Sequence, residues 1–256
     1  MTSVWVAWYR RVASGVLDLL YPPSCLGCDA SLEEMVEGVS LCEACQNQLA
    51  VIDWPVCQRC AERVPEVPGE PEDPGGEADC GHCRNDKLRF DQALAWGQYE
   101  GLLGELLLQM KRDRSERLAH LFSRLLIEEF GEKLLAQKFD AVVAVPMHPW
   151  RRFLRGANSP AVMASIIGRE IGVPFIQRQL SRRNSLAQKG LSRSSRFRNM
   201  RNEMRSRAGY HLGAFRVLLI DDILTTGATC SEAARALKQA GAAEVTVLVV
   251  GRTPTS

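Results

Sequence analysis

Residues 217–229 read VLLIDDILTTGAT, and this stretch decides the fold. Its four leading apolar residues are typical of a buried strand, which would end at the paired carboxylates of Asp221 and Asp222. Ligands of open α/β sheets bind beyond the carboxyl ends of the strands. Because adjacent like charges repel, we expect both carboxylates to face a ligand rather than each other.

A loop of small and hydroxyl-bearing residues follows the carboxylates and leads into a helix predicted to begin near Cys230. The loop consists of Thr225, Thr226, Gly227, Ala228 and Thr229. Small residues let backbone N–H groups converge, and a helix start adds positive potential, so the loop predicts a phosphate site. Neither GxxxxGK[ST] nor GxGxxG occurs, which excludes the two common nucleotide loops. A sugar phosphate fits best, with its vicinal hydroxyls on Asp221 and Asp222.

Strand and helix patterns alternate in the second half of the chain. Strands are predicted at 92–99, 141–146, 216–220 and 244–250, and helices at 102–111, 115–130, 158–172 and 230–241. This alternation predicts a parallel sheet with helices on both faces, so the fold class is α/β.

Nine cysteines stand out in the composition, and eight of them form four CxxC pairs. The pairs are Cys25/Cys28, Cys42/Cys45, Cys57/Cys60 and Cys80/Cys83. In a chain without an export signal, this spacing favours zinc over disulfides. We assign the first four cysteines to one zinc ion and the last four to another, while an interleaved pairing of the same residues stays open. Four thiolates leave no open coordination position, which indicates a structural role.

We expect two domains. Residues 1–88 would hold an N-terminal helix and the two zinc ribbons, and residues 89–256 the α/β domain. The insertion at 61–79 contains four prolines, three glycines and seven acidic residues, which predicts a flexible loop. Residues 1–23 form an amphipathic stretch that would pack on its own protein or lie at a membrane surface. No apolar run reaches the roughly 18 residues of a membrane span. Because the order of a signal peptide is also lacking, we expect a cytoplasmic location.

Two basic segments lie near the predicted strand ends. The segment VPMHPWRRFLRGAN at 145–158 follows a strand and carries Arg151 and Arg155, whose guanidinium groups could hold a pyrophosphate. Residues 178–207 contain nine arginines and one lysine against a single glutamate. We interpret this segment as a flap that closes over a polyanion, with a nucleic-acid-binding segment or a plain basic loop as alternatives.

These motifs together resemble the ComF (ComF/GntX) family of phosphoribosyltransferase-like proteins. VLLIDDILTTGAT resembles the phosphoribosyl pyrophosphate (PRPP) motif of type I phosphoribosyltransferases, and DLLYPPSCLGC at 18–28 resembles the entry into the family's zinc ribbon. Further matching positions are Tyr99, Lys111, Val145, Pro146, Arg151, Arg155, Gly156, Asn158, Gln188, Leu191, Arg196 and Asn199. The resemblance implies a type I phosphoribosyltransferase parallel-sheet core with an N-terminal double zinc-ribbon module.

The resemblance also implies an activity and a set of site residues. Asp221, Asp222, Arg151 and Arg155 would serve catalysis, the carboxylates and the 225–229 loop would bind PRPP, and Arg183, Gln188, Arg196 and Lys111 would serve the flap and the pyrophosphate. The protein would transfer phosphoribosyl to an unknown nitrogen acceptor and release pyrophosphate, with Mg²⁺ beside PRPP and Zn²⁺ in two structural sites.

The family's association with natural competence implies a role in DNA uptake, with single-stranded DNA or proteins of the competence machinery as partners. Two alternatives to the enzyme follow from the same resemblance. One is a non-catalytic competence protein that binds single-stranded DNA, and the other is a regulator that senses PRPP.

Overall fold

The computed structural model describes residues 24–32, 41–49, 51–52, 55–64, 80, 83, 88–112, 116–147, 158–182, 203–207 and 211–254. The chain forms two compact units, residues 1–49 and 50–256. The second group of four cysteines therefore shares a unit with the sheet, whereas the sequence suggested a division between residues 88 and 89. The predicted N-terminal helix and residues 65–79 of the acidic insertion lie outside the described residues.

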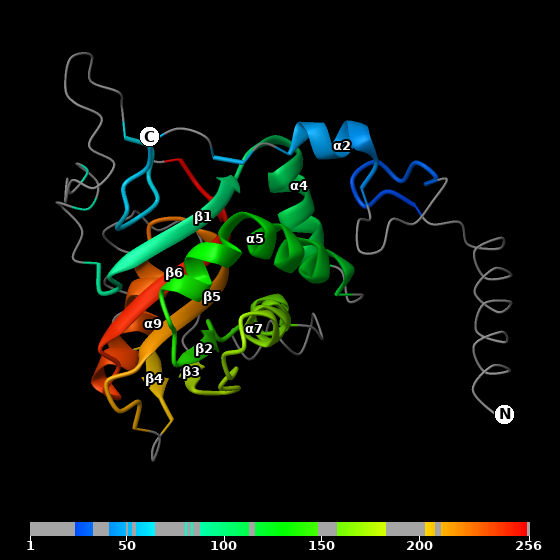
Figure 1. The fold of residues 1–256 in the computed structure, drawn as a ribbon. Coiled ribbons are helices and arrows are strands. Elements are labelled where there is room, and N and C mark those ends of the chain that lie inside the picture. Colours follow the sequence, from blue (N-terminus) through cyan, green and yellow to red (C-terminus); the bar gives the residue numbers. More distant parts are fainter. Residues whose placement is uncertain are drawn as a thin grey trace, which may run out of the picture. The chain divides into compact units, whose positions relative to one another are not determined.

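The four predicted strands and the four predicted helices occur in the expected order, and further short elements accompany them (Figure 1). The first unit contains α2 (Glu43–Gln48). The second contains β1 (Gln92–Gln98), α4 (Gly101–Met110), α5 (Arg117–Ala136), β2 (Ala141–Ala144), α7 (Ser159–Glu170), β3 (Leu180–Arg182), β4 (Met204–Ser206), β5 (Arg216–Leu224), α9 (Ala228–Gln239) and β6 (Glu244–Arg252).

Four strands form the main sheet in the order β1-β6-β5-β2, and every neighbouring pair is parallel. Helices α4, α5 and α7 cover one face of this sheet, and α9 covers the other together with the small antiparallel β3–β4 sheet (Figure 1). The predicted parallel sheet with helices on both faces is confirmed. The β3–β4 pair was not predicted, and it joins the two ends of the basic 178–207 segment.

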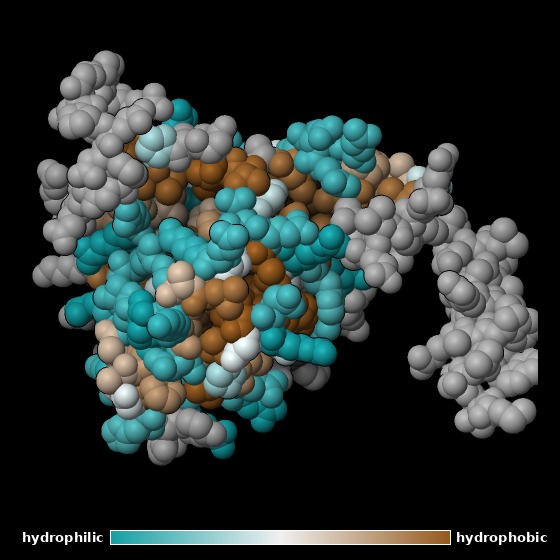
Figure 2. Space-filling view, in the orientation of Figure 1, coloured by the Kyte–Doolittle hydropathy of each residue, from teal (hydrophilic) through white to brown (hydrophobic). Residues whose placement is uncertain are grey.

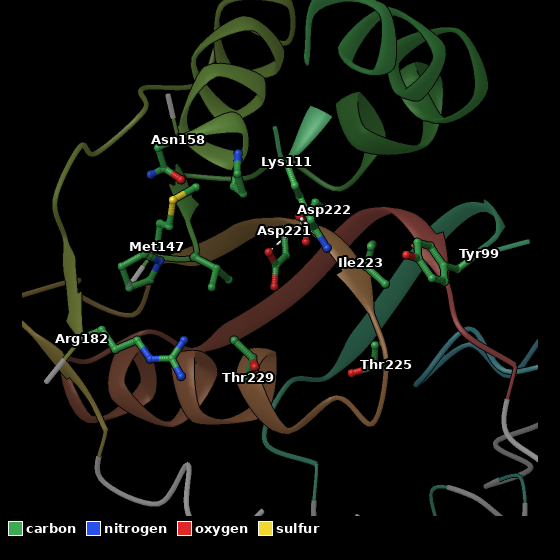
Figure 3. A pocket seen from close by; sticks show the side chains of 13 residues that line it. Tyr99, Lys111, Met147, Asn158, Arg182, Asp221, Asp222, Ile223, Thr225 and Thr229 are labelled. Carbon is green, nitrogen blue, oxygen red and sulfur yellow. Dashed lines mark hydrogen bonds and ion pairs between the residues drawn. The ribbon is translucent and has the colours of Figure 1, made fainter. Parts of the chain in front are cut away.

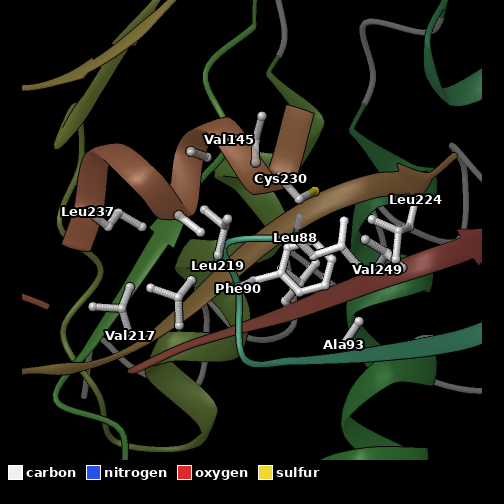
Figure 4. Close-up of a cluster of buried hydrophobic side chains, with 14 of the residues drawn as sticks. Leu88, Phe90, Ala93, Val145, Val217, Leu219, Leu224, Cys230, Leu237 and Val249 are labelled. Atoms are coloured by element: carbon white, nitrogen blue, oxygen red, sulfur yellow. The ribbon is translucent and has the colours of Figure 1, made fainter. Parts of the chain in front are cut away.

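The core beneath α9 connects the sheet to the second group of cysteines. Val217 and Leu219 of β5 belong to one buried cluster with Leu237 of α9, and Leu88 and Phe90 lie in the same cluster (Figure 4). The cluster also includes Cys57, Cys60 and Cys83. Each fully buried aliphatic side chain contributes roughly 1.5–3 kcal/mol to the free energy of unfolding. The second zinc ribbon is thus packed into the hydrophobic core of the α/β domain.

Hydrophilic side chains cover much of the face drawn in Figure 2, and hydrophobic side chains gather near its centre and along its upper part. Among the described residues, the exposed large hydrophobic side chains are Val56, Leu108 and Leu135. They come from three separate segments, and scattered residues of this kind are common on soluble proteins. No helix within the described ranges has both the length and the apolar character needed to cross a bilayer.

Candidate functional site

The candidate site lies where strand β5 extends beyond the end of its neighbour β2. The pairing of β2 with β5 ends at Ala144 opposite Ile220, whereas β6 follows β5 as far as Leu224. The predicted strand end at Ile220 was wrong, because β5 continues to Leu224 and carries both carboxylates within it. β6 supplies the backbone pairing that keeps this last part of β5 extended.

Asp221 and Asp222 point to opposite faces of the sheet, because side chains alternate along a strand. Asp221 lies on the α9 side, where the Cys230 thiol donates a hydrogen bond to its Oδ2 at 3.6 Å. Asp222 lies on the other side, and its Oδ2 is 3.3 Å from Nζ of Lys111, which follows α4. Alternation separates the two carboxylates and gives each a different partner.

The carboxyl group of Asp221 is protonated over an unusual pH range. Burial in the first place, and the charge of Asp222 in the second, raise the pKa of Asp221 from 3.8 to about 8. The backbone N–H of Asp222 opposes this shift by donating to Asp221 Oδ1 at 2.9 Å. Burial and the Asp221 charge likewise raise the pKa of Cys230 well above its usual value, so this thiol is a hydrogen-bond donor rather than a nucleophile.

The loop after β5 ends in the first turn of α9. This helix begins at Ala228, two residues before the predicted start, and Gly227 precedes it with a φ of 76°. A Cβ at Gly227 would lie 3.0 Å from Leu88 Cδ2, so both conformation and space favour glycine here. The hydroxyl of Thr226 accepts a hydrogen bond from the Ala228 N–H at 3.4 Å. The remaining free N–H groups at the start of α9 offer positive potential to an anion.

A pocket of about 350 Å³ brings these parts together (Figure 3). Its lining includes five predicted site residues, namely Lys111, Asp221, Asp222, Thr225 and Thr229. Four family-matching positions, Tyr99, Val145, Pro146 and Asn158, also line it. Thr226, Gly227 and Ala228 are outside the pocket lining and instead shape the loop and the helix start. A polar pocket of this size, with carboxylates, an ammonium group and threonines, suits a charged and hydroxylated ligand.

Arg182 was missed as a pocket residue. Its guanidinium group lies in the pocket near Thr229 (Figure 3), and it forms an ion pair with Glu203 at 3.0 Å. Arg182 belongs to β3 and Glu203 immediately precedes β4, so the pair joins the two ends of the predicted flap. The sequence contains several neighbouring arginines here, and the structure places Arg182 of β3 in the pocket. Met147, Pro160 and Ile223 also line the pocket and were not predicted.

Several predicted site residues lie outside the described residues. They are Arg151, Arg155, Arg183, Gln188 and Arg196. Their contribution to the pyrophosphate remains a prediction.

The eight paired cysteines form two clusters, and the sequential pairing is confirmed. The clusters are Cys25, Cys28, Cys42, Cys45 and Cys57, Cys60, Cys80, Cys83, with the four sulfur atoms of each within 4.8 Å of one another. Representative Sγ–Sγ distances are 3.6 Å (Cys28–Cys42) and 3.4 Å (Cys60–Cys80). Tetrahedral zinc with bonds of about 2.3 Å places its sulfur ligands about 3.8 Å apart. Each cluster therefore fits one zinc ion, with no ligand position left for a substrate.

Comparison with known proteins supports the zinc assignment. Residues 16–84 match a family model described as "Double zinc ribbon domain". The chain is 29% identical over 233 residues to the "DNA utilization protein YhgH" of Salmonella typhi, covering 83% of this chain and 97% of that protein. It is 24% identical over 233 residues to "Competence protein F" of Haemophilus influenzae, covering 89% of this chain and 96% of that protein.

Among solved structures, a purine phosphoribosyltransferase from Pyrococcus horikoshii Ot3 matches with 17% identity and a TM-score of 0.35, covering 51% of this chain and 83% of the other. The α/β assignment rests on the parallel sheet itself. The double zinc ribbon, and the similarity to the two relatives over most of their length, confirm the resemblance to the ComF family.

Proposed function

We propose that the pocket binds PRPP with Mg²⁺ and that the protein transfers phosphoribosyl to a nitrogen acceptor. The observation that carries this proposal is the convergence of Asp221, Asp222 and Lys111 with Thr225 and Thr229 on one pocket at the carboxyl end of β5. Carboxylates accept hydrogen bonds from sugar hydroxyls, whereas a helix start and threonine hydroxyls bind phosphate. PRPP carries both groups.

Each part of PRPP has a proposed partner. The 5′-phosphate would lie at the start of α9, with hydrogen bonds from backbone N–H groups and from Thr225 and Thr229. The ribose hydroxyls would lie on Asp221 and Asp222. The pyrophosphate would contact Lys111 and Arg182, together with the arginines predicted at 151 and 155.

Mg²⁺ fits this arrangement because its preferred ligands are carboxylate and phosphate oxygens. The carboxylates that would face it are those of Asp221 and Asp222, and the ion would neutralise part of the charge on the leaving pyrophosphate. Lys111 is already 3.3 Å from Asp222, so it can share its charge between this carboxylate and a bound pyrophosphate.

The reaction would break the bond between C1′ and the pyrophosphate oxygen and form a bond between C1′ and the acceptor nitrogen. Pyrophosphate leaves with the bonding electron pair, and the nitrogen loses its proton to a base. The protein's residues would act by orienting the reactants and stabilising the charge of the leaving group, without a covalent intermediate. A carboxylate of the pair would accept this proton, because Asp221 and Asp222 both line the pocket.

Calorimetry tests the proposal directly. We expect wild-type protein to bind PRPP only when Mg²⁺ is present, and Asp222→Asn to weaken this binding about 10- to 150-fold, because a charged hydrogen bond contributes about 1.5–3 kcal/mol. Glu128→Gln, which removes an exposed ion pair with Arg124 on α5, serves as the control and should bind normally. No heat from wild-type protein with PRPP and Mg²⁺ would refute the proposal. Binding without pyrophosphate release across a panel of bases would favour the PRPP-sensing regulator.

Arg182 and Glu203 should affect PRPP binding in opposite directions. Arg182→Gln removes a cation from the pocket and should weaken binding about tenfold, whereas Glu203→Gln removes the anion paired with Arg182 and should strengthen binding. Calorimetry with PRPP and with ribose 5-phosphate distinguishes contacts with the pyrophosphate from contacts with the ribose and the 5′-phosphate, because ribose 5-phosphate lacks the pyrophosphate. Equal effects of Arg182→Gln on both ligands would contradict the assignment of Arg182 to the pyrophosphate.

The names of the relatives favour a second role in DNA uptake. We propose that the protein acts in the cytoplasm, where thiolates stay reduced, and that it contacts single-stranded DNA or proteins of the competence machinery. Binding of a fluorescent oligonucleotide should weaken steeply with salt and should weaken further when the cysteines are replaced. Oligonucleotide binding that depends neither on salt nor on the cysteines would argue against this role.

A further inference from the structure

Arg252 at the end of β6 joins the second zinc cluster to the loop after β5. Its side chain is only 3% exposed, although it is charged. On one side its guanidinium group donates to the carbonyl of Cys60 at 3.1 Å and to the carboxylate of Glu62. On the other side it donates to the carbonyls of Leu224, at 3.0 Å, and Thr225. One rigid, planar group therefore fixes a zinc knuckle and the loop at once.

A second set of contacts joins the same two parts independently. Leu88, five residues after Cys83, packs where Gly227 lacks a side chain, with 3.0 Å between Leu88 Cδ2 and an ideal Cβ position. The carbonyl of Leu88 accepts a hydrogen bond at 3.2 Å from Arg59, which lies inside the Cys57–Cys60 knuckle. The next backbone N–H, that of Arg89, donates to Ser231 Oγ in the first turn of α9 at 3.0 Å.

We propose that Arg252 is a positioning residue that couples zinc binding at the second cluster to anion binding at the 225–229 loop. Zinc holds the turn that presents the Cys60 carbonyl, and Arg252 transmits this position to the carbonyls of Leu224 and Thr225. Those carbonyls share their planar peptide groups with the N–H groups of Thr225 and Thr226, so Arg252 also fixes the direction of these two N–H groups. Loss of the second zinc therefore loosens the loop.

This coupling is reciprocal, because two binding events that affect each other do so by the same factor. An anion that orders the loop must therefore strengthen zinc binding at the second cluster. The first cluster belongs to the other compact unit, residues 1–49, and provides the internal control. The identity of the anion rests on the proposed function, whereas the link between zinc and the loop does not.

Zinc affinity measured with a chromophoric chelator tests the coupling. Cys42→Ser and Cys80→Ser form a matched pair, because both cysteines are partly exposed ligands of different clusters. In equilibrium competition with the chelator, we expect PRPP with Mg²⁺ to raise the zinc affinity of Cys42→Ser protein, which keeps the second cluster, about 5- to 150-fold. The zinc affinity of Cys80→Ser protein, which keeps the first cluster, should stay unchanged. An equal gain in both variants, or bound PRPP with no gain in either, would overturn the coupling.

Hydrogen exchange tests the link without any ligand. Amides 225–230 should exchange faster in Cys80→Ser and in Arg252→Lys than in wild-type protein, and at the wild-type rate in Cys42→Ser. Lysine keeps the charge of Arg252, but it lacks the planar fork that reaches both sides. Glu62→Gln leaves the carbonyl contacts of Arg252 in place, so its effect on exchange should be smaller than that of Arg252→Lys. If these variants fail to fold, partial removal of zinc from wild-type protein gives the same readout. Unchanged exchange of the loop amides after loss of the second zinc would refute the inference, whether or not PRPP binds. If PRPP does not bind, the proposed function fails, and the exchange measurement alone decides the link between zinc and the loop.

Discussion

Asp221→Asn is expected to stabilise the folded protein and, at the same time, to remove most of its affinity for PRPP. Burial and the charge of Asp222 raise the pKa of Asp221 to about 8, whereas an unfolded aspartate titrates near about 3.9. Between these two pH values the folded state holds a proton that the unfolded state has lost. Stability contributed by this proton is present below about pH 4 and is lost progressively as the pH rises to about 8. Asparagine has no titrating carboxyl group, so the variant does not lose stability in this way as the pH rises.

The size of the effect follows from the shift. A change of about four pKa units corresponds to at most about 6 kcal/mol. We expect a gain of roughly 3 kcal/mol at pH 8, because the Cys230 thiol loses its carboxylate acceptor in the variant. Urea unfolding with zinc present would measure the difference between variant and wild type, which should be small near pH 4 and largest at pH 8. A variant less stable than wild type at pH 8 would contradict the raised pKa.

The substitution that stabilises the folded protein is expected to weaken its binding of PRPP. A carboxylate lost from the ribose site should weaken PRPP binding about 10- to 150-fold. Binding of PRPP with Mg²⁺ to wild-type protein should also release a proton near pH 7, because the cation favours the ionised form of Asp221. Calorimetry in buffers of different ionisation enthalpy detects this proton. The buried carboxyl group of Asp221 would thus lower the stability of the folded protein while it binds the ligand, which is a common trade-off between stability and function at a binding site.

The sequence predicted the parts of the fold that follow from continuous apolar patterns. The runs around Val142, Leu218 and Val247 are long enough to specify buried parallel strands, and the loop at 225–229 could be placed from its small residues alone. The end of β5 was misplaced because two adjacent aspartates resemble the end of a strand. Pairing with β6 overrides that local pattern and carries the strand to Leu224.

Features that depend on long-range pairing could not be predicted. The β3–β4 pair consists of two three-residue strands inside an arginine-rich segment, where no apolar alternation marks a strand. Glu62 was assigned to a flexible acidic insertion, yet its carboxylate pairs with Arg252, which lies 190 residues further along the chain. Such a contact has no local signal, because an isolated Glu or Arg is far more often a solvated surface residue.

Loss of zinc from the first cluster is expected to unfold its ribbon completely. The buried side chains among the described residues of the 1–49 unit are Cys25, Leu26, Leu41 and Cys45, so half of them are zinc ligands. Among the described residues, two buried leucines contribute too little apolar area to offset the entropy of ordering the chain. Structural zinc binds zinc-finger peptides with about 10–16 kcal/mol, and we expect this binding to supply most of the folding free energy here.

Cys45→Ser tests this dependence, and Cys60→Ser is the matched substitution of a buried ligand in the second cluster. We expect Cys45→Ser protein to hold one zinc ion per chain and to lose hydrogen-exchange protection throughout the described residues of the 1–49 unit, while β5 keeps its protection. In Cys60→Ser protein the ribbon residues should stay partly protected, because the second cluster packs against Leu88 and Phe90 in the core beneath α9. Protected amides around Cys25 in zinc-depleted Cys45→Ser protein would show that the first ribbon folds without its metal. The contrast between the two variants separates a ribbon that zinc alone folds from one that the α/β domain also supports.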